Sequence, residues 1–365
     1  MTVLLLVVIT ALIFEFINGF HDTANAIATS VATKVLTPRQ AIILAAVTNL
    51  LGALWGTAVA KTIASGLVDT SVVNSEVIFC ALIGGIVWNL LTWWLAIPSS
   101  SSHALIGGLC GAAFAAANES LSVIIWSVPS TTHWYEGKGL LWKVLIPTVF
   151  SPLLGFGISF LFMGALYISF KRTQPQIINK LFARLQIVSA AGMGFMHGTN
   201  DAQKTMGIIA LALLAATGAG TLDDLPSWLN FLRIEAPTAN QSLEIGTWIK
   251  VLCALTMAGG TAVGGWKIIK TLGHRMARLQ PIHGFAAEAS SSLVLFLASH
   301  FGIPVSTTHN ISSAVMGVGA ARRMSNVRWT VVERMLWAWI FTLPCSAIVA
   351  YAMYKLVHLL ATSVF

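Results

Sequence analysis

Charge is scarce in this chain: of its 365 residues only 9% are Asp, Glu, Lys or Arg, whereas 56% are apolar. Ordinary soluble domains carry about 25% charged residues, so the composition excludes that class. The sequence also lacks a long polar stretch that could fold as a separate soluble domain. It therefore predicts a protein that lies almost entirely in a membrane.

Cysteine is also sparse, and its placement excludes a disulfide framework or a cysteine metal site. The four cysteines stand singly in apolar stretches, without metal-ligand or redox spacing. A cleavable leader is not expected either. The first residues lack a basic start, and no small-residue cleavage site follows them, so residues 2–32 are expected to be a retained first span.

The basic residues are concentrated in connections between ten apolar runs, several of which reach the ~20 residues needed to cross a membrane. The runs are 2–32, 41–60, 77–96, 104–117, 140–170, 185–217, 246–266, 284–302, 304–320 and 335–361. If the N-terminus is outside and each run crosses once, the inward connections are 33–40, 171–184, 267–280 and 321–334. These hold most of the Lys and Arg residues, whereas the outward connections hold only Lys61, Lys138 and Arg233. The net charge of +8 therefore indicates membrane orientation and not a nucleic-acid partner.

This orientation gives five crossings in each half and inverts the second half relative to the first. The predicted fold class is an all-α polytopic membrane protein with two inverted-topology repeats of about five crossings each. Residues 1–170 are the first repeat, 171–184 a cytoplasmic connecting loop, and 185–365 the second repeat. Both termini are expected outside.

A polar motif recurs in both halves inside apolar sequence. Residues 19–26 read Gly-Phe-His-Asp-Thr-Ala-Asn-Ala, and residues 198–205 read Gly-Thr-Asn-Asp-Ala-Gln-Lys-Thr. The motifs place Asp22 and Asp201 in matching positions. A charged residue at the bilayer centre costs about 2.5–3.5 kcal/mol on insertion scales, so such residues are functional candidates. Two aspartates in matching positions of the two halves predict a transporter whose site lies where the halves meet. They also predict a break in the helix at each motif.

A second element also occurs once in each half. Residues 97–103 read Ile-Pro-Ser-Ser-Ser-Ser-His, and residues 303–309 read Ile-Pro-Val-Ser-Thr-Thr-His. Proline followed by hydroxyl residues is typical of a helix start, whose free amides and positive dipole end favour an anion. Hydroxyl clusters in membrane helices also bond to neighbouring helices, but the repetition favours an anion site. We expect re-entrant-type helix starts at the membrane midplane.

A cation must accompany an anion at such a site. At 4 Å and an effective dielectric of about 20, each pair of like unit charges costs roughly 4 kcal/mol. Aspartates therefore tolerate an oxyanion beside them only when they are protonated or bound to cations. His21, next to Asp22, could carry the proton because the unperturbed pKa of histidine is about 6.5.

The candidate site residues form three groups. Those expected to bind the anion are Ser100, Ser101, Ser102, Ser306, Thr307, Thr308, Asn25, Gln203 and Lys204. Those expected to couple transport to a cation or proton are Asp22, Asp201, His21 and Asn200. Secondary candidates, for which a structural hydrogen bond is the alternative, are Glu15, Glu288, His103 and His309.

The four motifs, in this order, resemble the inorganic phosphate transporter (PiT) family across essentially the whole chain. That family carries a Gly-Ala-Asn-Asp-type signature and a later Pro-x-Ser/Thr-Ser/Thr-Ser/Thr-His element in each half. His21 stands where the first signature usually has asparagine, as in the bacterial low-affinity Pit-type branch. The resemblance implies proton-driven uptake of phosphate, often as a neutral metal–phosphate complex.

We therefore expect a cation-coupled symporter that imports inorganic phosphate across the cytoplasmic (inner) membrane of a bacterium, with protons as the driving ion. Sodium coupling stays an alternative, and transport of another oxyanion such as sulfate a more distant one. A passive anion channel would not need paired aspartates, which repel anions. The expected partners are phosphate, the lipid bilayer and a second copy in a homodimer.

A metalloenzyme is the remaining alternative, with His21, Asp22, His197 and Asp201 as ligands. No general-base or His-Glu-x-x-His pattern accompanies these residues. The sequence thus predicts neither an enzyme nor a resident metal or cofactor. The co-transported H⁺ or Na⁺, and a divalent metal that accompanies phosphate, would be substrates.

Overall fold

A computed structural model describes residues 2–130, 137–235, 243–277 and 279–363, and these residues are mainly helical. The helices of the first half are α1 Thr2–Ala32, α2 Pro38–Ala53, α3 Ala58–Ser65, α4 Ser75–Trp94, α5 Ser101–Ala116 and α6 Ile146–Ser169. Those of the second half are α7 Pro175–Gly218, α8 Thr247–Val263, α9 Trp266–Lys270, α10 Pro281–His300, α11 Thr307–Arg322 and α12 Trp329–Ser363. Within these ranges only isolated β-bridges occur, so the all-α prediction is confirmed.

Local sequence signals fix several of the helix starts. Thr37 caps α2 in a capping box with Gln40, and Pro38 follows at the first helical position. The side chain of Asn74 accepts a hydrogen bond from the Val77 amide at the start of α4. Such caps satisfy backbone donors that the helix itself leaves unpaired.

The ten predicted runs correspond to ten helices or helix pairs, but not all of them are long enough to cross. In the described ranges, α1, α4, α6 with the preceding turn, α10 and α12 are long and apolar enough to cross a membrane. The bent pairs α2–α3 and α8–α9 raise that number from five to seven. Helices α5 and α11 have 16 residues each, about 24 Å, against a hydrocarbon core of about 30 Å. The full count of ten crossings stays a prediction.

The predicted helix breaks at Asn18–Asp22 and His197–Asp201 are wrong, because α1 and α7 run unbroken through both motifs. The motif side chains find partners on neighbouring helices, so the backbone keeps its helical hydrogen bonds. The breaks lie instead between α2 and α3, bent by 69°, and between α8 and α9, bent by 60°. Gly56 and Gly264 stand at these bends with φ of 81° and 75°, which glycine adopts without steric cost.

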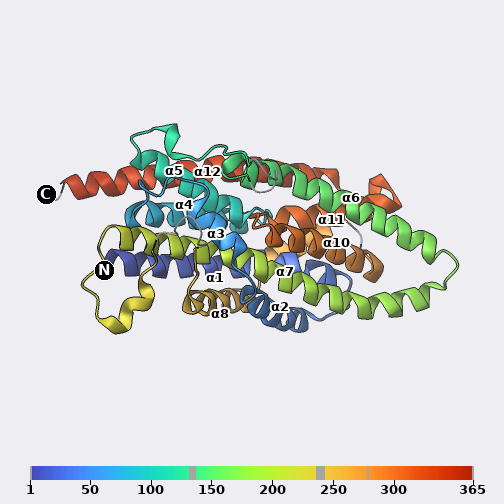
Figure 1. Ribbon diagram of the computed structural model, residues 1–365. Coiled ribbons are helices and arrows are strands. Elements are labelled where there is room, and N and C mark those ends of the chain that lie inside the picture. The colour runs from blue at the N-terminus through green and yellow to red at the C-terminus, as the bar shows by residue number, and fades with distance from the viewer. Residues whose placement is uncertain (1, 131–136, 236–242, 278, 364–365) are drawn as a thin grey trace.

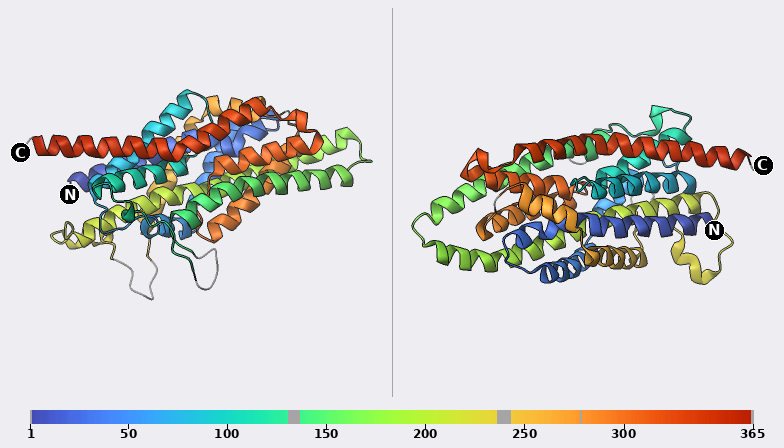
Figure 2. Two further views of the ribbon diagram at one scale, coloured as in Figure 1. Left: turned by 90° about the horizontal axis from the view of Figure 1, so that it is seen from above. Right: turned by 180° about the vertical axis from the view of Figure 1, so that it is seen from behind.

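The helices run mostly along one axis of an elongated bundle (Figure 1). The start of α1 and the end of α12 lie at one end, and the connection between α6 and α7 lies at the other. Figure 2 shows the same arrangement from above and from behind. In both halves a long motif-bearing helix is followed by a bent pair, a long helix, a short helix and a long helix. This order suits two repeats, whose inverted relationship stays a prediction.

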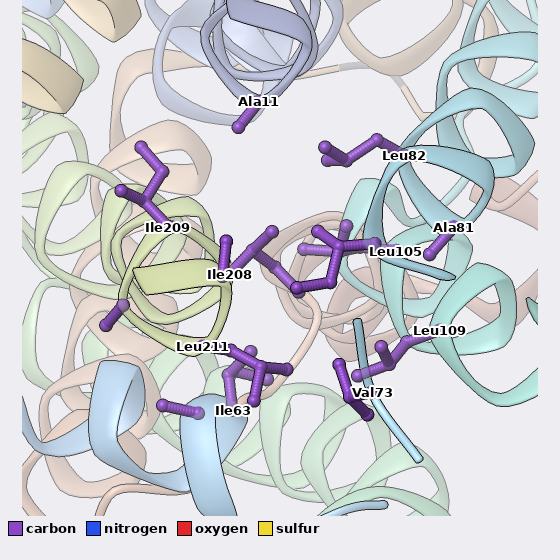
Figure 3. Packing of buried hydrophobic residues seen from close by; sticks show 14 of the residues in the cluster. Ala11, Ile63, Val73, Ala81, Leu82, Leu105, Leu109, Ile208, Ile209 and Leu211 are labelled. Atoms are coloured by element: carbon purple, nitrogen blue, oxygen red, sulfur yellow. The ribbon is translucent and has the colours of Figure 1, made fainter. Parts of the chain in front are cut away.

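Two apolar clusters lie on either side of the polar motifs. In one, residues such as Ala11 of α1, Ile63 of α3, Leu105 of α5 and Ile208 of α7 gather (Figure 3). Along α1 this cluster ends at Phe14, and the second begins at Ala24. The polar residues between them are therefore closed off from both ends of the bundle by packed side chains.

Candidate functional site

Helices α1 and α7 pack against each other, and carboxylate oxygens of Asp22 and Asp201 lie within 4.8 Å of each other. Both side chains are buried, with at most 2% exposed. Gly19 and Gly198 let the motif helices lie close to two other helices, because a Cβ on Gly19 would lie 2.4 Å from the Met257 carbonyl oxygen of α8. A Cβ on Gly198 would likewise lie 2.2 Å from the Asn49 carbonyl oxygen of α2. Each motif helix thus lies tightly against a bent helix of the other half.

Asp22 is contacted from both halves of the chain. His21 Nδ1 lies 2.9 Å from Asp22 Oδ1, and Thr308 of α11 donates to the same oxygen at 3.2 Å. Ser101 of α5 donates a hydrogen bond to Asp22 Oδ2. Both short helices therefore reach this carboxylate.

Asp201 has three partners of different chemistry. Thr307 of α11 donates to Asp201 Oδ2 at 2.8 Å, and the Lys204 ammonium binds Asp201 Oδ1. His197 Nε2 lies 3.1 Å from Oδ2. The second carboxylate is thus placed beside the one ammonium of the cluster.

Helices α5 and α11 begin where the sequence predicts. Ser100 caps α5 by accepting the His103 amide at 3.1 Å, and Ser306 caps α11 by accepting the His309 amide at 3.2 Å. From these starts α5 extends into the half of the bundle that holds the termini, and α11 into the other half (Figure 1). The positive ends of two helix dipoles therefore meet at the aspartates.

Lys204 is almost fully buried, so its ammonium does not extend to a membrane surface. Besides Asp201 it donates to Ser102 Oγ and, at 2.9 Å, to the Val305 carbonyl. Asn200 donates to the same carbonyl at 3.1 Å. These bonds tie α7 to both short helices.

Two amide oxygens at the site accept no hydrogen bond. Asn25 uses its amide nitrogen to donate to Thr307 at 3.1 Å and to Thr308 at 2.9 Å, which leaves its Oδ1 without a donor. The buried Oδ1 of Asn200 is in the same position. A buried acceptor without a donor costs folding free energy. An amide oxygen in this state can act as a ligand to a cation.

The charges of the cluster also favour a cation. Among the residues that the structure describes, Lys204 is the one ammonium that contacts these aspartates, so the cluster with neutral histidines is negative. Burial of an uncompensated charge is unfavourable. A bound oxyanion would add to this negative charge, so hydroxyl donors and helix ends can hold an anion here only together with added cations or protons.

Gln203 is not brought to this cluster, although it was predicted to bind phosphate. Its Oε1 accepts from the Val59 amide at 2.8 Å, and its Nε2 donates to the Trp55 carbonyl at 3.3 Å. It therefore caps the start of α3 at the break after α2. Because residues two apart differ by 200° around a helix, Gln203 faces away from Asp201 on the unbroken α7.

The secondary candidates also lie outside the cluster. Glu15 accepts from Thr205, two helical turns before Asp22. Glu288 accepts from Thr29 and Ser189, and from Gln186 at 3.4 Å. Both carboxyls are fully buried with hydroxyl partners.

The two histidines brace the starts of the short helices. The rings of His103 and His309 lie 4.8 Å apart between centroids, His103 Nε2 lies 2.9 Å from Thr148 Oγ1, and His309 stacks on Trp339. Neither side chain is hydrogen-bonded to an aspartate within the described residues.

Sequence reasoning missed Asn18 as a residue of the cluster, and it considered His197 only as a ligand in the metalloenzyme alternative. Asn18 Oδ1 accepts from Ser101 at 2.7 Å, and His197 faces Asp201. Both precede their aspartate by four residues, a spacing that puts them on the same helix face, and this matched spacing was the available signal. Ligand atoms of Asp22, His197 and Asp201 also lie within 4.8 Å of one another, as a metal ion would require. The expected absence of a resident metal stays a prediction.

Comparison with known proteins places these motifs in a family. Residues 18–350 match the phosphate transporter family. A relative from Bacillus subtilis (strain 168), which bears the name "Probable low-affinity inorganic phosphate transporter", is 43% identical over 98% of this chain and 97% of its own. One of the same name from Rhizobium meliloti (strain 1021) is 41% identical over 96% of this chain and 95% of its own.

A solved structure of a sodium-dependent phosphate transporter shares the fold, with a TM-score of 0.79 and 24% identity over 98% of this chain and 100% of that one. The match covers the helices that carry both motif pairs. The chain belongs to the phosphate transporter family.

Proposed function

We propose that this multi-pass membrane protein is a symporter that carries inorganic phosphate into a bacterial cell together with a cation, and that protons are the driving ion. The observation that carries the proposal is the meeting of two helix starts and Lys204 with Asp22 and Asp201. Groups that can donate hydrogen bonds to an anion and carboxylates that can bind a cation lie in one buried cluster. The names of the relatives supply the substrate, inorganic phosphate.

Phosphate is proposed to bind the hydroxyls at the starts of α5 and α11. Ser101, Thr307 and Thr308 donate to the aspartates, so their hydrogens already point into the cluster. The Ser102 hydroxyl oxygen accepts from Lys204. Lys204 would supply a positive charge. Ser100 and Ser306 act through their caps, which leave the following amides oriented toward the same place.

Coupling is proposed to reside in the aspartates. His21 Nδ1 lies 2.9 Å from Asp22 Oδ1, and this contact between an imidazole and a carboxylate supports a proton as the coupling ion. The unpartnered amide oxygens of Asn25 and Asn200 favour the alternative of sodium, which prefers oxygen ligands. Phosphate can donate a proton to a neighbouring carboxylate and sulfate cannot, so the acceptors favour phosphate.

The inner membrane is the proposed location, with both termini outside. Their position at one end of the bundle, opposite the connection after α6, supports an N-terminus and a C-terminus on one side. The homodimer stays a prediction.

Reconstituted vesicles test the proposal. Labelled phosphate uptake is measured under an inward proton gradient and, separately, under an inward sodium gradient, with sulfate as competitor. The proposal predicts accumulation with the proton gradient and no competition by sulfate. Accumulation with the sodium gradient alone would show that sodium, and not the proton, is the driving ion. The absence of phosphate uptake under either gradient would contradict the proposal.

A further inference from the structure

A cavity of about 300 Å³ lies between the end of α6, the start of α7 and the start of α10. It belongs to the end of the bundle that holds the connection between α6 and α7, opposite the termini (Figure 1). Asn179, which lines the cavity, and Asp201 are 22 residues apart on the unbroken α7, a distance of about 33 Å along the helix. The cavity is therefore separate from the cluster around the aspartates.

The cavity lies where the apolar surface of the bundle changes to a basic one. Ile168 near the end of α6 is 71% exposed, and Ile177 in the first turn of α7 is 55% exposed. In a membrane such side chains contact the hydrocarbon chains of lipids. Lys171 and Arg172 follow directly after α6, and the segment 164–186 contains neither aspartate nor glutamate. We therefore expect the headgroups of the surrounding lipids at this level.

The lining of the cavity is amphipathic. Leu166, Phe170 and Ile282 contribute apolar surface, whereas Tyr167 and Lys171 contribute a hydroxyl and an ammonium. The Lys171 side chain is exposed, and no carboxylate of the described residues forms an ion pair with it. An anion in the cavity would therefore meet a positive charge that no neighbouring carboxylate neutralises.

The Tyr167 hydroxyl offers a hydrogen to the same anion. The backbone amide of Gln280 donates to His283 Nδ1 at 3.0 Å, so the hydrogen of this imidazole is on Nε2. Nε2 lies 2.7 Å from Tyr167 Oη and donates to it. The hydrogen of the hydroxyl itself then has no acceptor among the described residues. Arg322, at the end of α11, is close enough to act electrostatically on Tyr167 and adds positive charge.

We propose that this cavity binds the headgroup of an anionic phospholipid, such as phosphatidylglycerol, from the leaflet on this side of the membrane. The lipid phosphate accepts hydrogen bonds from Lys171 and Tyr167, and the acyl chains lie along the exposed apolar residues of α6 and α7. Basic pockets between membrane helices are typical sites for anionic headgroups. A free phosphate ion could use the same two donors, but it would gain nothing from the apolar walls.

Lipid binding is measured by native mass spectrometry on the purified, delipidated full chain in a neutral detergent. Dioleoylphosphatidylglycerol is compared with dioleoylphosphatidylcholine, which has the same chains and no net charge. We expect one phosphatidylglycerol per chain and weaker binding of phosphatidylcholine. Lys171→Gln should lower the affinity for phosphatidylglycerol by about tenfold or more, as for other lost hydrogen bonds to a charged group. Lys171→Arg should preserve it, because a guanidinium also binds phosphate.

Lys180→Gln is the matched control, because Lys180 is exposed near the start of α7 but does not line the cavity. It removes the same charge from the same end of the bundle and should leave the affinity unchanged. Tyr167→Phe should also weaken binding. Thermal unfolding shows whether this variant is destabilised, since the His283 N–H loses its acceptor, and in that case the comparison rests on the Lys171 variants.

Equal affinities of Lys171→Gln and the unsubstituted chain for phosphatidylglycerol would overturn the lipid site. Equal losses in Lys171→Gln and Lys180→Gln would also overturn it, because they would indicate general attraction to a basic surface. Displacement of the lipid by inorganic phosphate would assign the cavity to a soluble anion instead. The experiment does not measure transport, so none of these results bears on the proposed function.

Discussion

Thr308 donates a hydrogen bond to Asp22 Oδ1 at 3.2 Å although 286 residues separate them. The bond joins the start of α11, in the second half, to the motif helix of the first half. Ser101 reaches the same carboxylate from α5. Neither half of the chain therefore contains the whole cluster, and a change to either short helix alters the surroundings of Asp22.

The hydroxyls can be tested in pairs. Replacing Ser101 and Thr307 together with alanine should raise the dissociation constant for phosphate, because each lost bond to a charged group contributes about 1.5–3 kcal/mol. Each such loss is about tenfold or more in affinity. Equilibrium binding of labelled phosphate to the purified variant measures the change.

Thr256→Ala serves as control for that pair, because the Thr256 hydroxyl bonds to the Leu252 carbonyl within α8. Its phosphate affinity should equal that of the unsubstituted chain. Unchanged affinity in the double variant would assign Ser101 and Thr307 a structural role only.

A substitution at Gln203 tests whether this side chain binds phosphate or caps helix α3. Gln203→Leu removes the acceptor for the Val59 amide, so the free energy of unfolding should fall by about 1 kcal/mol, as for other lost caps. The phosphate affinity of the folded protein should not change. Thermal unfolding and phosphate binding measure the two effects, and a large loss of affinity with unchanged stability would return Gln203 to the phosphate site.

Gly111 tests how closely the short helix α5 must be held. A Cβ at this position would lie 2.1 Å from the Ala347 carbonyl oxygen of α12, and a backbone atom there cannot move aside easily. Gly111→Ala should therefore lower stability by about 1–3 kcal/mol or more through overpacking. Gly157→Ala in α6, where nothing lies within 4 Å, should be tolerated. Equal melting temperatures of the two variants would contradict this account.

Much of the site could be predicted because its signals are local. Proline and hydroxyl residues specify the starts of α5 and α11, and an aspartate in apolar sequence stands out without any structural knowledge. The helix breaks could not be placed, because whether polar side chains interrupt a helix depends on partners from distant segments. The predicted role of Gln203 was wrong for the same reason, because it depended on whether α7 is broken at the second motif. If α7 had been taken as continuous, the 200° between Asp201 and Gln203 would have excluded a shared site.

The orientation in the membrane can be tested by labelling single cysteines. Gln174 in the connection between α6 and α7 and Ser227 after α7 are both exposed, whereas Cys80, Cys110 and Cys253 are buried and Cys345 is half-buried. In intact cells an impermeant reagent should label Ser227→Cys and leave Gln174→Cys unlabelled until the membrane is opened. The reverse pattern would contradict the proposed sidedness.

The paired aspartates provide the most direct test of the central claim, that one shared site couples phosphate to a cation. Asp22→Asn and Asp201→Asn preserve side-chain size but remove the charge and the capacity to take up a proton. In reconstituted vesicles each variant should exchange labelled for unlabelled phosphate and yet fail to accumulate it under an imposed inward proton gradient. Full accumulation in both variants would contradict the account and would place the coupling elsewhere, with Glu15 and Glu288 as the next residues to test.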